Sequence, residues 1–351
     1  MKKYVIIIII LSFFVSFQIN ADSSFHLEYL WEITISPHYF PVGHLSLPVL
    51  CKDKIYENLV NAPNYNCHNI YDAKTGQVLK STNYPPSIDS LGLYTNGKQV
   101  VYVHEQNKKI IIYDGLNIIW EKVFNDPISQ VSVDTNNIFI LTSKNLMRID
   151  ISNKKIHNIF NEAEICINND IYSNYLLNDK KYLYYFNSEY LFKINKNTYE
   201  IEAKMKYVGL NDIVLQNDKY LFSSYMKILD KKTDEIISIS NSGRGFTAND
   251  KYIVYTDDNK LITKNIKTRK IVWEKEFKEN NTLTPTIKEE FLYIYLEKFY
   301  VINVNNGNIV WEDKIRDDYF EYVPQIIVKD NYVSIFIDNR GESKLRMYRK
   351  Y

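Results

Sequence analysis

One hairpin recurs along this chain at a nearly constant spacing. A strand ending in Asp or Asn leads into a polar turn, and an apolar strand follows. The six full copies are YDAKTGQVLK (71–80), IDISNKKIHN (149–158), INKNTYEIEA (194–203), LDKKTDEIIS (229–238), KNIKTRKIVW (264–273) and INVNNGNIVW (302–311). YDGLNIIW (113–120) is the same unit shortened by two residues. The Asp or Asn that begins the turn of each copy recurs about every 38 residues from Asp72 to Asn303, and this spacing is the size of a propeller blade.

Each hairpin follows further strand-like segments. Polar turns open the apolar runs NDKKYLYYF (178–186), NDKYIVYT (249–256) and KDNYVSIF (329–336), and shorter runs such as ISQVSVD (128–134) precede them. An aromatic content of 15% also favours strands, because aromatic side chains fit a pleated, half-buried surface. Each repeat therefore predicts four strands, and the chain predicts an all-β array.

The two ends of the chain complement each other. The last strand pair, NYVSIFI (331–337) and KLRMYRKY (344–351), has no tryptophan strand after it, and YLWEITI (29–35) has no hairpin before it. We therefore expect an eight-bladed β-propeller in which the N-terminal strand completes the C-terminal blade and closes the ring. Seven blades with a free N-terminal arm are the alternative.

The four tryptophans occupy equivalent places. Trp31, Trp120, Trp273 and Trp311 each stand in the strand after the turn or its counterpart, and each precedes a glutamate. The pattern Asp-x-x-Thr-Gly-x-x-x-Trp resembles the tryptophan-docking repeat of the PQQ-like (quinoprotein) β-propellers. This family includes the PQQ-dependent alcohol dehydrogenases and the outer-membrane barrel-assembly lipoprotein BamB.

The resemblance implies structural roles for these residues. In that family the indole stacks on the adjacent blade, so we expect the four tryptophans to dock one blade on the next. We expect the aspartates to accept hydrogen bonds from nearby backbone amides rather than to act in catalysis. The predicted turn residues are Asp72, Thr75, Gly76, Asp114, Asp150, Asp230 and Gly307.

Sequence signatures of catalysis are missing. No two cysteines are adjacent, unlike in many dehydrogenases of the family, and no C-x-x-C-H haem site, G-x-S-x-G, P-loop or GxGxxG occurs. The six histidines lack metal-ligand spacing. The sequence therefore predicts no catalytic, cofactor-binding or metal-binding residue and no cofactor. The signatures of WD40 and kelch repeats are also absent.

These observations favour a non-catalytic scaffold that binds a protein partner in the cell envelope, similar in kind to BamB, as a monomer. Arg244, between two glycines in SGRGF (242–246), is the candidate partner-binding residue, with a plain turn and a solvated arginine as the alternative. The alternative function is a small PQQ-dependent or other ligand-binding enzyme. Removing the leader leaves 41 basic and 42 acidic side chains, which gives no reason to expect a nucleic-acid partner.

The N-terminus predicts export. Two lysines, an apolar run from Val5 to Phe17 and a small residue at Ala21 indicate a signal peptide over residues 1–21. Residues 22–351 then form a single propeller domain without a membrane span. The apolar run is shorter than the ~20 residues of a spanning helix, and an uncleaved anchor is the alternative. The first cysteine is Cys51, too late for lipid attachment, so the sequence predicts a periplasmic or secreted protein.

Two cysteines could form a disulfide in that compartment. Cys51 and Cys67 flank one predicted strand-turn-strand unit. Burial as small apolar side chains is the alternative.

Overall fold

The computed structural model describes residues 25–35, 48–61, 65–84, 90–104, 108–161, 175–187, 189–206, 213–223, 226–239, 244–277, 285–296, 298–316, 325–339 and 342–351. Its regular structure consists of β-strands, and none of these segments forms a helix with the length and hydrophobicity of a membrane span. The predicted signal peptide, residues 1–21, lies outside the described residues.

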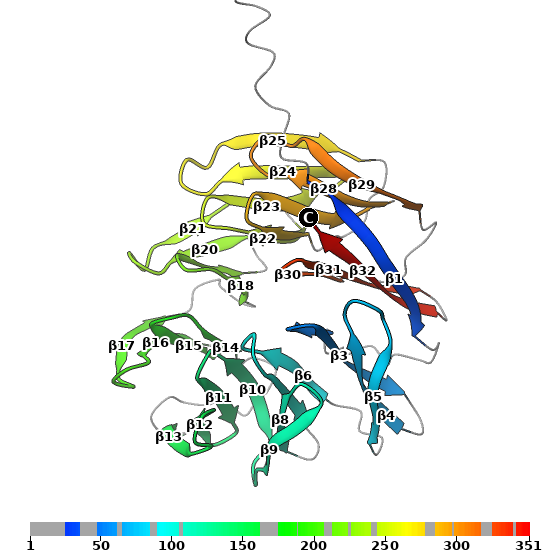
Figure 1. Cartoon of the computed structure of the whole chain (residues 1–351). Coiled ribbons are helices and arrows are strands. Elements are labelled where there is room, and N and C mark those ends of the chain that lie inside the picture. Colours follow the sequence, from blue (N-terminus) through cyan, green and yellow to red (C-terminus); the bar gives the residue numbers. More distant parts are fainter. Residues whose placement is uncertain are drawn as a thin grey trace, which may run out of the picture.

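The strands form eight four-stranded sheets, arranged as blades of a propeller (Figure 1). We number the blades from the first complete one in the sequence.

Blade 1 contains β2 (Val49–Cys51), β3 (Lys54–Asn61), β4 (Tyr65–Asp72) and β5 (Val78–Tyr84), and blade 2 contains β6 (Ser90–Thr95), β7 (Val100–His104), β8 (Lys109–Asp114) and β9 (Asn117–Val123). Blade 3 contains β10 (Ile128–Val133), β11 (Asn137–Thr142), β12 (Asn145–Asp150) and β13 (Ile156–Asn161), and blade 4 contains β14 (Tyr175–Asn178), β15 (Tyr182–Phe186), β16 (Tyr190–Asn195) and β17 (Ile201–Lys206). Blade 5 contains β18 (Ile213–Gln216), β19 (Tyr220–Ser223), β20 (Lys227–Asp230) and β21 (Ile236–Ser238), and blade 6 contains β22 (Arg244–Ala248), β23 (Tyr252–Asp257), β24 (Lys260–Asn265) and β25 (Ile271–Glu276). Blade 7 contains β26 (Thr286–Lys288), β27 (Phe291–Tyr295), β28 (Lys298–Asn303) and β29 (Ile309–Arg316), and blade 8 contains β30 (Gln325–Lys329), β31 (Tyr332–Asn339), β32 (Glu342–Lys350) and β1 (Leu27–Ile35).

The eighth blade is built from both ends of the chain. Strand β1 pairs antiparallel with β32, with Leu27 opposite Lys350 and Ile35 opposite Ser343. Figure 1 shows β1, in blue, beside β32, in red. The predicted eight-bladed ring with a composite last blade is confirmed, and the seven-bladed alternative is wrong.

The core lies between the blades. Eight separate clusters of buried side chains correspond to the eight junctions between neighbouring blades. The middle strands supply both sides: in β7, Val101 and Val103 pack toward blade 3, whereas Val100 and Tyr102 pack toward blade 1. This arrangement explains why these strands are nearly continuous apolar runs instead of alternating apolar and polar residues.

Buried polar contacts accompany the closure. Arg346 of β32 is 2% exposed; its guanidinium donates to Glu32 of β1 and, at 3.0 Å, to the hydroxyl of Tyr295 in blade 7. The hydroxyl of Tyr348 donates to Asp313, which also belongs to blade 7. A buried charge needs such partners, so these contacts favour one register of the closing strands.

Candidate functional site

One face of the propeller carries two turns from each of blades 1 to 7 and one turn from blade 8, whose third and fourth strands come from opposite ends of the chain. An inner turn joins the first and second strands, and an outer turn joins the third and fourth strands; we call this face the turn face. In six blades a backbone N–H of the outer turn donates to a carbonyl of the inner turn, as from Ala73 to Asp53 (2.9 Å) and from Lys231 to Lys219 (2.9 Å). In these six blades a hydrogen bond therefore holds the outer turn against the inner turn.

Three of the predicted turn aspartates cap outer turns. Asp72 Oδ1 accepts from the N–H groups of Lys74 (3.0 Å) and Thr75 (2.8 Å), and the Thr75 hydroxyl also donates to it (3.0 Å). Asp150 and Asp230 accept equivalent backbone hydrogen bonds.

Asp114 behaves differently from the other three. Its turn is two residues shorter, with Asp114 directly opposite Asn117, so the N–H groups that a capping carboxylate would reach are missing. Its carboxylate instead pairs with Lys52 of blade 1 at 2.9 Å.

The fifth residue of each full-length outer turn has a left-handed backbone. It is glycine at Gly76 (φ +72°) and Gly307 (φ +76°), and other residue types at Lys154, Tyr199, Asp234 and Arg269, with φ between 57° and 62°. The glycines stand where a tryptophan of the preceding blade packs. A Cβ added to Gly76 would lie 2.8 Å from Trp31, and one added to Gly307 would lie 2.9 Å from Trp273.

The same two indoles donate hydrogen bonds across the junction. Trp31 Nε1 donates to the carbonyl of Ala73 at 3.0 Å, and Trp273 Nε1 donates to that of Val304 at 2.7 Å. Trp120 packs on the cluster between blades 2 and 3, and Trp311 lies edge-on to Tyr348 of blade 8, with ring centroids 5.8 Å apart. Each tryptophan thus contacts the blade that follows it.

At two junctions that lack tryptophan, a lysine donates the hydrogen bond to the following blade. This role of lysine was not predicted from the sequence. Lys80, in the tryptophan position of blade 1, donates to the carbonyl of Leu116 at 2.9 Å. In blade 4 that position is Ala203, and Lys193 on the neighbouring strand donates to the carbonyl of Lys231 at 2.8 Å. The lysines could have been suspected only by aligning strand registers.

We expect Gly307→Ala to destabilise the protein by about 2–3 kcal/mol, since the methyl group adds a clash with Trp273 to the usual penalty for a left-handed backbone. Arg269→Gly, at the same turn position of blade 6, is expected to stabilise by up to about 1 kcal/mol because it removes that penalty. Denaturant unfolding measures both changes. If both substitutions changed the free energy of unfolding by the same amount in the same direction, the packing of the Trp273 indole on Gly307 would be contradicted.

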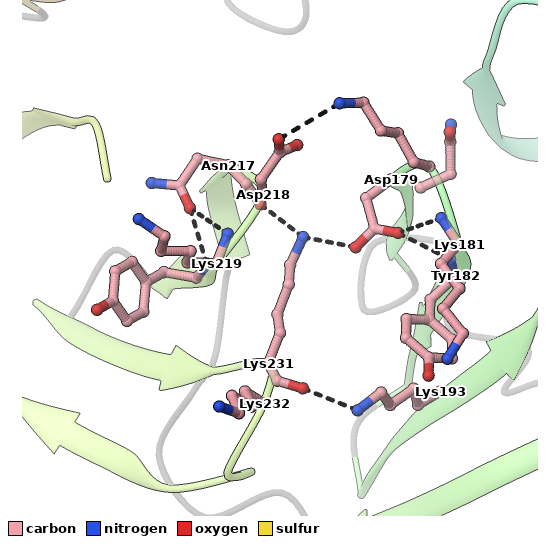
Figure 2. A network of polar contacts seen from close by, with 12 residues as sticks. Asp179, Lys181, Tyr182, Lys193, Asn217, Asp218, Lys219, Lys231 and Lys232 are labelled. Atoms are coloured by element: carbon pink, nitrogen blue, oxygen red, sulfur yellow. Dashed lines mark hydrogen bonds and ion pairs between the residues drawn. The ribbon is translucent and has the colours of Figure 1, made fainter. Parts of the chain in front are cut away.

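Buried lysines also connect blades 3, 4 and 5, and Figure 2 shows the contact between blades 4 and 5. Lys231 Nζ, on the outer turn of blade 5, lies 2.9 Å from Asp179 Oδ2 on the inner turn of blade 4 and 2.6 Å from the carbonyl of Asn217. The side chains of Lys231 and Asp179 are 6% and 13% exposed. Lys196 makes the equivalent ion pair with Asp134, one junction earlier.

The pKa of Asp179 reflects this contact. Burial would raise the pKa, but hydrogen bonds from Lys231 and from the backbone of Tyr182 and Lys181 hold it below the usual range. Asp179 is therefore an ionised structural partner rather than a proton donor or acceptor.

A groove of about 440 Å³ opens on the turn face across blades 5, 6 and 7. Its apolar lining includes Ala248, Tyr252, Ile287 and Val304. Charged residues of both signs, Asp250, Lys251, Lys288, Glu289 and Glu290, stand around it, and Asn217 of blade 5 lines one end. No predicted site residue lies in this groove.

Two buried titratable groups of blade 1 are shifted in pKa. Burial raises the pKa of Glu57 to about 7, against the opposing effect of hydrogen bonds from Tyr71 and Asn69. Burial lowers the pKa of His68 to about 4. Glu57 accepts from the hydroxyl of Tyr71, which packs toward blade 8, whereas His68 stacks on Tyr102 of blade 2. The two groups thus face opposite junctions and do not form an acid–base pair.

We expect Glu57→Gln to stabilise the protein relative to the wild type increasingly as pH rises from 4.5 to 7. A carboxyl group whose pKa is raised on folding contributes stability while protonated and loses it as pH rises through the folded pKa. The difference should approach about 3 kcal/mol, corresponding to a shift from 4.5 to about 7. Unfolding of both proteins at matched pH measures it, and a difference independent of pH would contradict it. Because burial lowers the pKa of His68, the stability that this residue contributes is lost as pH falls. This contribution is the same in both proteins, so it cancels in the comparison.

The predicted disulfide does not form. Cys51 is a free, buried thiol on β2, and Cys67 lies on β4, with β3 between them. Strands are spaced about 4.8 Å apart, so the backbones are about 10 Å apart, beyond the ~7 Å limit for a disulfide. The two cysteines flank a strand-turn-strand unit in sequence, but β2 and β4 pair with opposite edges of β3, which keeps them apart.

Arg244 begins strand β22 opposite Thr256 instead of lying in a loop between blades. It is at the end of β22 away from the inner turn, so it is separate from the groove. Its side chain lies outside what the structure describes. Over the described part of the chain, no three His, Cys, Asp or Glu side chains are grouped to hold a metal ion.

Comparison with known proteins identifies the repeat. The family model of outer membrane protein assembly factor BamB matches residues 223–333, from the end of β19 into β31. Among curated proteins, none matches the chain in sequence.

Solved structures share the fold. BamB from Moraxella catarrhalis superposes with a TM-score of 0.61 at 11% identity, covering 92% of this chain and 100% of that one. The computationally designed protein Ika8 gives 0.57 at 12% identity, covering 88% and 99%. The dihydro-heme d1 dehydrogenase NirN gives 0.58 at 11% identity, covering 91% and 78%. At these identities the likeness concerns the fold alone.

Proposed function

Because the chain is a β-propeller of the PQQ-like, BamB-type repeat family, we propose that it is an exported, non-catalytic scaffold that binds a protein partner in the cell envelope. The observation that carries the proposal is the match of residues 223–333 to the family model of an assembly factor. The resemblance of the N-terminal residues to a signal peptide supports export.

The turn face supports a binding role. Its capping carboxylates accept backbone hydrogen bonds, and its buried lysines are paired between blades. These polar groups therefore build a rigid surface and are engaged in holding it together. A rigid surface favours partner binding because little conformational entropy is lost on association.

The alternative is a small quinoprotein-like enzyme, since a dehydrogenase shares the fold to a similar degree. The sequence favours the scaffold because adjacent cysteines and a haem-attachment motif are missing. We expect no dye reduction above background when PQQ, calcium and an alcohol are added to the purified protein. Cofactor-dependent turnover would support the enzyme instead.

A crosslinking experiment tests the scaffold directly. A photoreactive amino acid is placed singly on the turn face, at Lys251 or Lys288, and as a matched control on an outer strand, at Lys122. After expression with the native leader, we expect one protein adduct from the turn-face positions that the control does not give. Retention of the protein inside the cytoplasm, or the same adducts from Lys251, Lys288 and the control position, would contradict the proposal.

A further inference from the structure

The inner turns of blades 2 to 6 share one arrangement at their first residue, which is Asn96, Asp134, Asp179, Asn217 or Asn249. Its side-chain oxygen accepts backbone N–H groups of its own turn, as Asn217 Oδ1 does from Lys219 (2.9 Å) and Tyr220 (2.8 Å). At four junctions the rest of this side chain is bonded to the following blade. Asn96 and Asn249 donate through Nδ2 to the backbone carbonyls of Thr135 (3.2 Å) and Glu289 (3.4 Å), while Asp134 and Asp179 pair with Lys196 and Lys231.

The junction between blades 5 and 6 departs from this arrangement. Asn217 Nδ2 is buried and has no hydrogen-bond partner among the described residues. The position that supplies the lysine in blades 4 and 5 is Ile266 in blade 6, which is 2% exposed and packs in the apolar cluster of this junction. Figure 2 shows the nitrogen of Asn217 pointing away from Lys231. A buried donor without an acceptor is unfavourable, so an external acceptor at this place would be stabilising.

Asn217 lines the groove across blades 5–7. We propose that this groove binds a peptide segment of a partner, with a backbone carbonyl accepting from Asn217 Nδ2 and an apolar side chain against Ala248, Tyr252, Ile287 and Val304. The proposal rests on the proposed function and gives its docking place.

The molecule itself indicates the chemistry of the acceptor. At the junctions after blades 2 and 6, the equivalent amide donates to a peptide carbonyl. Charge disfavours a free carboxylate, because the groove carries Asp250, Glu289 and Glu290 beside Lys251 and Lys288. A neutral peptide group needs only the donor and the apolar lining, and both are present.

The test uses N-acetyl-leucine methylamide as the probe, which carries peptide carbonyls and one apolar side chain without charge. Side-chain amide signals of the ¹⁵N-labelled protein are followed by NMR during titration, and Asn217 is assigned by its loss in Asn217→Asp. We expect the Asn217 signal to shift and saturate in the millimolar range, as for a ligand of this size. N-acetylglycine methylamide and acetate should each bind at least about five-fold more weakly.

Asn217→Asp keeps the cap of the turn, as Asp134 and Asp179 do in blades 3 and 4, and removes only the donor. We expect it to weaken probe binding about five-fold, followed through the Ala248 methyl signal, without lowering the melting temperature. Asn96→Asp, at the same turn position far from the groove, should leave binding unchanged. An unshifted Asn217 signal, equal binding by Asn217→Asp, or acetate binding as tightly as the probe would overturn the proposal.

The two proposals can fail separately. If the crosslinked partner is captured equally by the wild type and Asn217→Asp, the docking place is wrong and the scaffold role remains. If the wild type captures no partner, the proposed function is wrong even when the groove binds the probe.

Discussion

Deletion of residues 25–35 is expected to abolish the stable monomer. The deletion removes β1, so it leaves β32 as an open edge and takes away the indole of Trp31, which is 8% exposed and bonded to blade 1. It also leaves Arg346 buried without Glu32. An unpaired edge beside an exposed apolar blade face promotes aggregation. Size-exclusion chromatography and thermal unfolding should show soluble aggregates or a fall in melting temperature of more than about 15 °C.

The control removes Asp22, Ser23 and Ser24 only, which should leave both measurements unchanged. A monomeric deletion variant that unfolds at the wild-type temperature would contradict the role of β1.

Lys231→Met is expected to destabilise the protein by about 3–5 kcal/mol. Removing the ammonium group leaves Asp179 buried and without its ion pair, and this is the costly way to break a buried pair. The double variant Lys231→Met, Asp179→Asn should recover most of the loss, because it leaves neither charge buried and the asparagine can still cap the turn, as Asn217 does in blade 5. Denaturant unfolding of the single and double variants gives both values.

Lys219→Met is the matched control. Lys219 also pairs with an aspartate of a neighbouring blade, Asp250 at 2.8 Å, but the two side chains are 59% and 46% exposed. Exposed pairs contribute little, so this variant should unfold like the wild type. If Lys219→Met and Lys231→Met were equally harmful, or the double variant no better than the single, burial would not explain the effect.

Local features were predictable from the sequence because each repeat contains them. The turn of Asp72 has its aspartate, threonine and glycine within five residues, and their hydrogen bonds are formed inside that segment. The place of Trp31 in an incomplete repeat was enough to predict that β1 closes the ring.

Contacts between blades were harder to predict from the sequence. Lys193 and Lys231 belong to strands or turns whose registers decide what they reach, and nothing in the local pattern distinguishes them from exposed lysines. The error over Cys51 and Cys67 has the same origin, since strand order within the blade determines their separation. The buried amide of Asn217 depends on an absence, the isoleucine at 266 where blades 4 and 5 have lysine, and this is visible only after the blades are superposed.

A disulfide across the closing strands tests the central structural claim most directly. Glu28 of β1 lies opposite Arg349 of β32, and directly opposed residues of antiparallel strands have Cα atoms close enough for a disulfide. With the native cysteines replaced by serine, the variant Glu28→Cys, Arg349→Cys should form an intramolecular disulfide in the monomer, and Glu28→Cys with Leu345→Cys should not. Crosslinks only between molecules, or none in the matched register, would contradict the composite eighth blade.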